Sequence, residues 1–222
     1  MNLSQVMQRA DVWKGGWRGE APAIATVSSG FPVLDEKLPG GGFPLGALTE
    51  LLVPRHGIGE LSLVLRAAAK LTRDRWLTFI APPYVPYAPA LAGAGIDLSR
   101  VLVVHARDYN DTLWSVEQAL RAGTCGAVLA WPSQADFKWL RRLQLAAEPS
   151  GALSVLFMPA RYENTASPAA LRLALDASPT GLGVRVIKSR GGWPAAPVRL
   201  EVHRALAMSR SSVPVARGLH AR

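Results

Sequence analysis

Short apolar segments alternate with amphipathic segments along most of this chain, and this alternation strongly limits how it can fold. The apolar segments have the length and composition of strands that are buried on both faces. Strands separated by helices pair in parallel, because each helix returns the chain to the edge where the previous strand began. We therefore predict an α/β fold, with a mostly parallel sheet flanked by helices. The predicted strands span Leu48–Val53, Trp76–Ala81, Arg100–His105, Ala127–Trp131 and Ala152–Met158.

The segments between these strands are predicted to be helices. Leu61–Leu71 has apolar residues at helical spacing along one stripe. Asp111 is predicted to cap a helix that runs through Leu120 and is ended by Gly123. Further helices are predicted over Tyr87–Gly95 and Ala135–Ala147, and in the second of these Phe137, Leu140 and Leu143 are expected to face the core.

The chain divides into three predicted parts. Residues 1–23 form an arm with a short helix over Leu3–Asp11. Residues 24–204 form the α/β domain, and residues 205–222 form a basic tail that we expect to be mobile because it lacks apolar periodicity. The domain is expected to close with an antiparallel strand pair, formed by Val184–Lys188 and Val198–Val202.

Composition excludes several classes of protein. A chain of 222 residues that is 49% hydrophobic and 18% charged is long enough for its own core and is not largely disordered. Cys125 is the single cysteine, which excludes a disulfide framework and favours a reducing, cytoplasmic compartment. No long apolar run free of charge indicates a membrane span, and the first residues lack the apolar segment of a signal peptide. The four histidines are scattered without a metal-ligand motif, so no metal site is expected.

The net charge of +9 is concentrated at the C-terminal end. Residues 185–222 contain eight basic residues against Glu201 alone, a net charge of +7, so the preceding residues carry only +2. A basic end on a nearly neutral body is consistent with an anionic partner, either nucleic acid or an acidic protein surface. It is equally consistent with a tail that is basic for solubility.

The segment between the first predicted strand and its helix has the position of a phosphate-binding loop but not its chemistry. Such a loop follows G-x-x-x-x-G-K-[ST], in which backbone amides and the Lys bind phosphate and the hydroxyl binds magnesium. Here Pro54 replaces the first Gly, Glu60 the Lys and Leu61 the hydroxyl residue, whereas Gly57 and Gly59 remain in the loop. A carboxylate about 4 Å from a phosphate charge repels it by about 4 kcal/mol at an effective dielectric constant near 20. We therefore predict a vestigial loop that does not bind ATP tightly.

Residues before this loop resemble the entry to the RecA ATPase core. The resemblance is carried by Ser28–Phe31, Leu34–Asp35, Leu38 and Gly40–Gly46, with Glu50 beyond. It continues through Gly95–Asp97, Glu117–Leu120 and Val186–Arg190, and covers roughly residues 24–202. It implies a RecA-like core with a degenerate phosphate-binding loop.

Within that superfamily, local runs resemble the ImuA family of bacterial mutagenesis proteins, which is grouped with the SulA cell-division inhibitors. The runs are Asp11–Trp13 with Trp17–Gly19, Trp76–Ala81 with Pro82–Leu91, Trp114 with Glu117–Leu120, Leu140–Ala146 and Ser167–Leu173.

Two further departures from RecA accompany Glu60. The resemblance places Pro83 where RecA has its water-activating Glu, and Trp131 where the fourth strand would end in a magnesium-linked Asp. Phosphoryl transfer depends on charges at these positions. We therefore expect a pseudo-enzyme with no catalytic residues, no cofactor and no metal.

The candidate contact residues are aromatic and basic. The resemblance places Lys188 and Arg190 where RecA has basic residues that reach the neighbouring protomer's nucleotide. An isolated pair of this kind is more often two solvated charges on a hairpin. Trp139 beside basic residues could stack on a base or enter a partner pocket, or simply pack. The full set of candidates for partner or DNA contact is Trp13, Trp17, Trp139, Arg141, Arg142, Lys188, Arg190, Arg204, Arg210 and Arg217.

The ImuA resemblance implies a non-catalytic adaptor in SOS-induced translesion DNA synthesis. The implied partners are an ImuB-type homologue of the Y-family polymerases, an error-prone DnaE-type polymerase that is reached indirectly, and RecA, with weak DNA binding by the basic tail. Two alternatives stay open: a SulA-like inhibitor that binds the division protein FtsZ, and a weak DNA-dependent ATPase or DNA-binding module.

Overall fold

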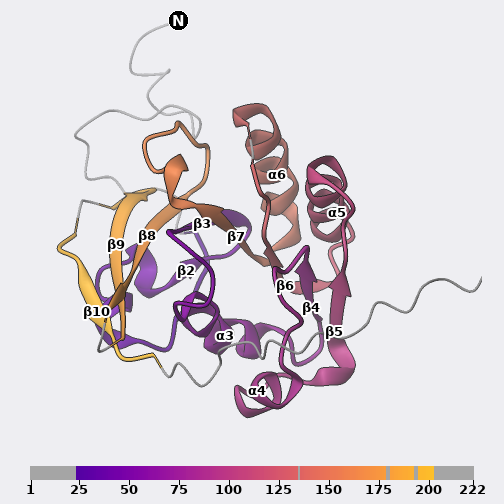
Figure 1. Cartoon of the computed structure of the whole chain (residues 1–222), viewed down its shortest axis with the longest axis horizontal. Coiled ribbons are helices and arrows are strands. Elements are labelled where there is room, and N and C mark those ends of the chain that lie inside the picture. The colour runs from indigo at the N-terminus through magenta and orange to yellow at the C-terminus, as the bar shows by residue number, and fades with distance from the viewer. Residues whose placement is uncertain (1–23, 135, 179–180, 193–194, 203–222) are drawn as a thin grey trace, which may run out of the picture.

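A central eight-stranded sheet organises the chain. The structure is a computed structural model that describes residues 24–134, 136–178, 181–192 and 195–202. The strands follow the order β10-β9-β8-β3-β7-β6-β4-β5 (Figure 1). Their bounds are Ala47–Val53 for β3, Trp76–Ile80 for β4, Val101–Val104 for β5, Cys125–Ala130 for β6, Leu153–Pro159 for β7, Leu171–Ser178 for β8, Gly181–Ser189 for β9 and Val198–Leu200 for β10.

The mostly parallel sheet confirms the fold predicted from the sequence. β3, β4, β5, β6, β7 and β8 pair in parallel, and the five predicted strands correspond to five of these. The antiparallel pair of β9 and β10 is also confirmed.

The sequence analysis missed β8, which is parallel to β3 and antiparallel to β9. Its residues Leu171, Leu173 and Leu175 lie in the core. The intervening Arg172 is buried as well, through its ion pair with Glu50, and a pattern of apolar residues does not reveal such a pair.

Four main helices cover the two faces of the sheet (Figure 1). α3 (Glu60–Leu71) and α4 (Ala88–Gly93) lie on one face, over a first core that contains Leu63 and Leu91. α5 (Tyr109–Arg121) and α6 (Phe137–Ser150) lie on the other face, over a second core. No helix in the described ranges is long and apolar enough to cross a membrane.

The residues that resemble the RecA entry form a compact lead-in to β3. A two-stranded antiparallel pair, β1 (Thr26–Val27) and β2 (Phe43–Pro44), encloses α2 (Pro32–Asp35) and the 3-10 turn η1 (Pro39–Gly41). The carboxylate of Asp35 accepts hydrogen bonds from Ser28 Oγ at 2.7 Å and from the Ser29 N–H at 2.9 Å. A Cβ at Gly42 would overlap the Val27 carbonyl, so only glycine fits there.

Two helix details differ from the prediction. The N-cap of α5 is Asp108 and not Asp111, because the Asp108 side chain accepts the Asp111 N–H at 2.9 Å. In α6, Leu140 and Leu143 are buried as predicted, but Phe137 is 49% exposed. Each three-residue step turns a helix by about 300°, so Phe137 lies about 120° away from Leu143 around the axis.

Ala81 has a left-handed backbone conformation, with φ of 50°, directly after β4. This conformation costs a non-glycine residue about 1–2 kcal/mol, whereas glycine loses about 0.5–1 kcal/mol through its flexibility when unfolded. We expect Ala81→Gly to raise the free energy of unfolding by about 0.5–1 kcal/mol in urea denaturation. The control Ala92→Gly, in α4, should lower it by about 1 kcal/mol. A loss of stability in Ala81→Gly would contradict this account.

Candidate functional site

The loop between β3 and α3 lies at the carboxyl end of the parallel strands, where α/β proteins bind their ligands. Gly57 and Gly59 both have positive φ, 82° and 104°, and so turn the loop tightly. Ile58 between them is buried in the first core and fixes the loop to the body. The loop is therefore a tight turn that is anchored to the body of the protein.

The Glu60 carboxylate occupies the concave side of this loop. It accepts backbone N–H groups from Gly57 at 2.8 Å, Ile58 at 2.9 Å and Gly59 at 3.1 Å. Consecutive amides that point at one position form an anion-binding nest, and the adjoining helix N-terminus favours the same charge. The sequence analysis expected Glu60 to repel a phosphate. In the structure its carboxylate binds the amides that would hold one, and the side chain is only 6% exposed.

Packing encloses the filled nest. A Cβ at Gly59 would lie 2.8 Å from a methyl group of Val202, which lies two residues beyond the end of β10. Leu61 packs against the first core. His56 Nδ1 lies 4.0 Å from the Glu60 carboxylate, whereas Pro54 is exposed. Among the described loop residues, therefore, the group that meets the amides is a protein side chain.

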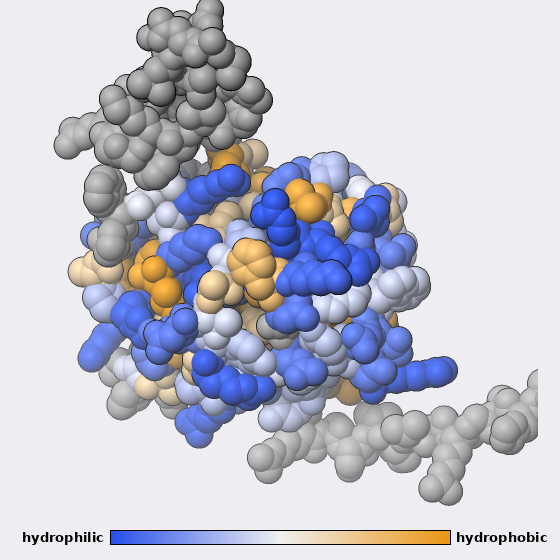
Figure 2. Space-filling model, turned by 90° about the horizontal axis from the view of Figure 1, so that it is seen from above, coloured by the Kyte–Doolittle hydropathy of each residue, from blue (hydrophilic) through white to orange (hydrophobic). Residues whose placement is uncertain are grey.

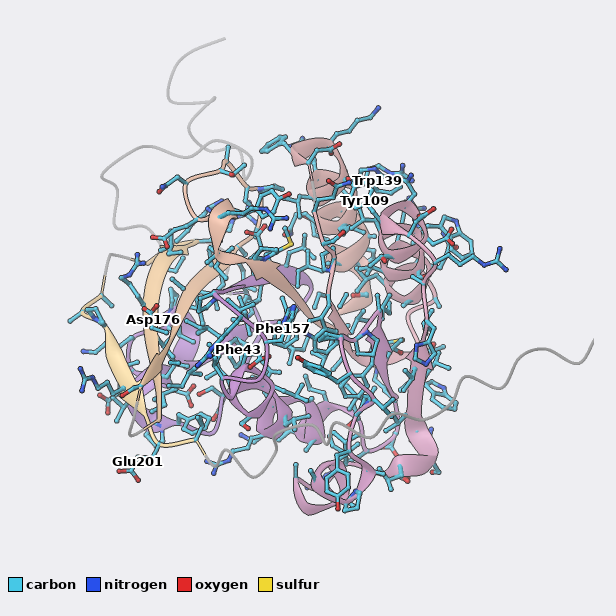
Figure 3. All side chains as sticks on the ribbon, in the orientation of Figure 1. Phe43, Tyr109, Trp139, Phe157, Asp176 and Glu201 are labelled. Carbon is cyan, nitrogen blue, oxygen red and sulfur yellow. The ribbon has the colours of Figure 1, made fainter. Side chains whose placement is uncertain are left out.

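An aromatic stack fills the space at the end of β6. Trp131 lies 4.4 Å from Phe157 and 6.0 Å from Phe79 between ring centroids, and all three rings are nearly parallel. Phe157 lies in the interior of the molecule (Figure 3). Trp131 is thus a buried member of the first core, at the position where the RecA resemblance predicted a magnesium-linked acid.

The end of β4 likewise lacks an acid. Ala81, Pro82 and Pro83 follow the strand, and Pro83 is exposed. Among the described residues, no group of three or more His, Cys, Asp or Glu side chains could hold a metal ion.

A groove of about 430 Å³ lies between α3 and α4, with Phe31, Tyr87 and Val202 among its walls. Its walls are mostly apolar. Arg66, the cation in its lining, donates to the Gly30 carbonyl at 3.0 Å and lies over the Phe31 ring. Beside the nest the structure therefore offers a hydrophobic hollow whose cation is already engaged.

A buried ion pair joins β3 to β8. Arg172 Nε donates to the Glu50 carboxylate at 2.7 Å, and Ser167 Oγ donates to its other oxygen. The Arg172 guanidinium also donates to the carbonyls of Tyr162 at 2.8 Å and Glu163 at 3.2 Å. These bonds compensate the desolvation of both charges and fix the segment from 160 to 170 against the sheet.

Lys188 lies beside this ion pair on β9, opposite Arg172. Its Nζ donates to the Ser167 carbonyl at 2.7 Å. Burial and, to a lesser extent, the nearby Arg172 charge hold the pKa of Lys188 below its ordinary value. Arg190 is exposed two residues later, and within the described ranges its side chain makes no hydrogen bond or ion pair. The structure thus brings the two candidate cations to one edge of the β8–β9 hairpin.

Arg142 and Trp139 form part of a connection between α5 and α6. Arg142 donates to the buried Glu117 carboxylate at 2.6 Å and lies over the Trp139 ring at 4.2 Å. Arg121 contacts the same carboxylate at 2.9 Å. Trp139 on α6 and Tyr109 on α5 are both partly buried against the second core (Figure 3). Arg141, next to Arg142 in sequence, is exposed. Among the described residues its side chain has no hydrogen-bond or ion-pair partner.

The other predicted contact residues lie outside the described ranges: Trp13, Trp17, Arg204, Arg210 and Arg217. The sequence analysis also missed Glu50, Arg172 and Glu117 as interacting charges. A single acid inside an apolar strand, as in LTELLV, indicates a buried partner, although it does not identify one.

Removal of the Glu60 carboxylate should open the nest. We expect Glu60→Ala to lower the free energy of unfolding by about 2–3 kcal/mol, because three amides lose a charged acceptor. Added inorganic phosphate should restore part of this stability by binding the vacant amides, as measured by thermal unfolding at several phosphate concentrations. The control Glu36→Ala, at an exposed position, should change stability by less than about 0.5 kcal/mol and show no such restoration. A Glu60→Ala variant that phosphate does not stabilise would contradict the assignment of the nest.

The position of Lys188 predicts a measurable titration. After reductive methylation with labelled carbon, the Lys188 signal in NMR should titrate below the pH at which a free lysine peptide does. Since the unfolded chain then holds this proton to a higher pH, the contribution of Lys188 to stability rises as pH increases between the folded and unfolded pKa values. Lys188→Met should lack that part of the pH dependence. A Lys188 midpoint at or above that of the peptide would refute the predicted shift.

Known proteins with similar sequences fall into three named groups, and no family model matches the chain. Protein ImuA of Caulobacter vibrioides is 32% identical over 149 residues, which cover 64% of this chain and 60% of that protein. Cell division inhibitor SulA of Pseudomonas aeruginosa is 30% identical over 136 residues, which cover 58% of this chain and 84% of that protein. Protein RecA of Chlorobaculum parvum is 28% identical over 107 residues, which cover 48% of this chain and 30% of that protein.

These similarities agree with the mostly parallel sheet and its antiparallel C-terminal strands. They also confirm the resemblance on which the sequence analysis relied, although the chain spans less than two thirds of the ImuA length. The chain belongs to the SulA/RecA-like superfamily, and it fits the ImuA proteins within it.

Proposed function

We propose that this chain is a non-catalytic accessory protein of SOS-induced translesion DNA synthesis, which acts in the cytoplasm. The proposal rests on its similarity to ImuA together with one structural observation, the Glu60 carboxylate on the loop amides. A nucleotide would have to displace a covalently attached anion from a buried position. The aromatic stack around Trp131 offers no acid that could bind magnesium. The prolines after β4 offer no base that could activate water.

Without ATP hydrolysis, the protein would act by binding other proteins through its surface. The partners we propose are an ImuB-type homologue of the Y-family polymerases, an error-prone DnaE-type polymerase that is reached through it, and RecA. Lys188 and Arg190 are the cations we propose for contact with a RecA-type neighbour, because Lys188 is held in place by Ser167 and both lie on one hairpin edge. The basic C-terminal tail would add weak DNA affinity.

A pull-down with purified proteins tests this function. The immobilised chain should retain a purified ImuB-type homologue and should release no phosphate from ATP, with or without single-stranded DNA. Lys188→Glu with Arg190→Glu should weaken association with RecA filaments. The matched control Arg73→Glu with Arg107→Glu changes two other exposed cations and should leave association unchanged. Failure to retain the homologue, or ATP turnover that is lost on substitution near Gly59, would reject the proposal.

The alternative with specific support is a SulA-like inhibitor, because the similarity to SulA covers 84% of that protein. A SulA-like chain would bind FtsZ and block its assembly. Overproduction would then give filamentous cells, and the purified chain would reduce FtsZ polymerisation measured by light scattering. The accessory function predicts cells of normal length and unchanged FtsZ polymerisation.

A further inference from the structure

The outward side of α5 and α6 combines exposed apolar side chains with fixed cations. Trp114 on α5 is 58% exposed and Leu145 on α6 is 55% exposed. Trp114 lies one turn before Glu117, and Leu145 one turn after Arg142, the two residues whose ion pair joins the helices. We call Trp114, Arg121, Arg142 and Leu145 the α5–α6 outer face.

The cations of this face are held in place before any partner arrives. Glu117 is buried, and its two oxygens bind Arg121 at 2.9 Å and Arg142 at 2.6 Å. Arg142 is fixed further by the Trp139 ring beneath it. A long side chain that must be immobilised on binding loses conformational entropy, and here that ordering is already done. Tryptophan and arginine fixed in this way are typical of the residues that dominate protein–protein binding.

Seen from above, the molecule shows small apolar areas among mostly hydrophilic residues (Figure 2). The α5–α6 outer face likewise combines two exposed apolar side chains with charged ones. A small apolar centre with a polar rim is the usual anatomy of a protein–protein interface.

The charges favour a protein partner over nucleic acid. The two helices and their caps carry four basic residues, Arg121, Lys138, Arg141 and Arg142, against the five acids Asp108, Asp111, Glu117, Asp136 and Glu148. A phosphate backbone requires a net positive surface, which this layer lacks. Two of the acids, Asp108 and Asp136, cap the helix N-termini, so the centre of the face keeps two arginines around one carboxylate.

We infer that the α5–α6 outer face docks a protein helix that presents an apolar stripe flanked by carboxylates. The apolar side chains would cover Trp114 and Leu145, which are roughly 9 Å apart along the helix axes. The carboxylates would meet the outer N–H groups of Arg121 and Arg142, whose charge is only half balanced by Glu117. This inference rests on the geometry of the face and does not depend on the partners proposed above.

Two synthetic helical peptides test it. Both carry one stripe of leucine and phenylalanine, flanked in one peptide by glutamates and in the other by lysines. In fluorescence anisotropy with the full chain, the glutamate peptide should bind and the lysine peptide should bind at least tenfold more weakly. The double variant Trp114→Ala with Leu145→Ala should bind the glutamate peptide at least tenfold more weakly than the wild-type chain does.

Matched controls separate this face from general hydrophobic binding. Trp76→Ala with Leu102→Ala removes two other exposed apolar side chains and should leave affinity unchanged. Arg121→Ala should lower the affinity for the glutamate peptide but not for the lysine peptide. The helix pair should stay intact in this variant, because Arg142 still pairs with Glu117. Equal binding of both peptides, unchanged binding by the Trp114/Leu145 variant, or displacement of the peptide by single-stranded DNA would overturn the inference. So would self-association of the wild-type chain through this face, measured by analytical ultracentrifugation.

Discussion

The amides of residues 57 to 59 are bound by a carboxylate that belongs to the next residue in the chain, Glu60. Backbone N–H groups at a helix start require an acceptor, and in a phosphate-binding loop the ligand supplies it. Here the acceptor is covalently attached, so the loop keeps its shape without a ligand. The junction of β3 and α3 depends on this bond, and the first core lies against it through Ile58.

Close packing also fills the surroundings of the loop. Trp131 stacks between Phe79 and Phe157, where the RecA resemblance would place a charged side chain facing a metal. A buried ring stabilises the fold continuously, whereas an unpaired buried carboxylate would destabilise it. The three stacked rings therefore contribute to the first core.

Charge in this protein is used mainly to fix surface geometry. Glu50 holds Arg172 inside the sheet, and Arg172 in turn lies beside Lys188 at the hairpin edge. Glu117 positions Arg121 and Arg142 on the opposite helical layer. In the sheet the buried acid fixes a buried arginine. In the helical layer the buried acid orders two arginines at the surface, an arrangement suited to binding by preformed contacts.

The sequence by itself determined the alternation of strands and helices, the antiparallel C-terminal pair and the loss of the lysine from the loop, because these depend on local periodicity and residue type. It missed β8, since Arg172 interrupts the apolar pattern and is tolerated only because Glu50 pairs with it across strands. It could not separate Arg141 from Arg142, which are neighbours in sequence but differ by about 100° around the helix. Only the tertiary structure decided that Arg142 meets Glu117, and that the Glu60 carboxylate fills the nest, because both depend on where the chain folds back on itself.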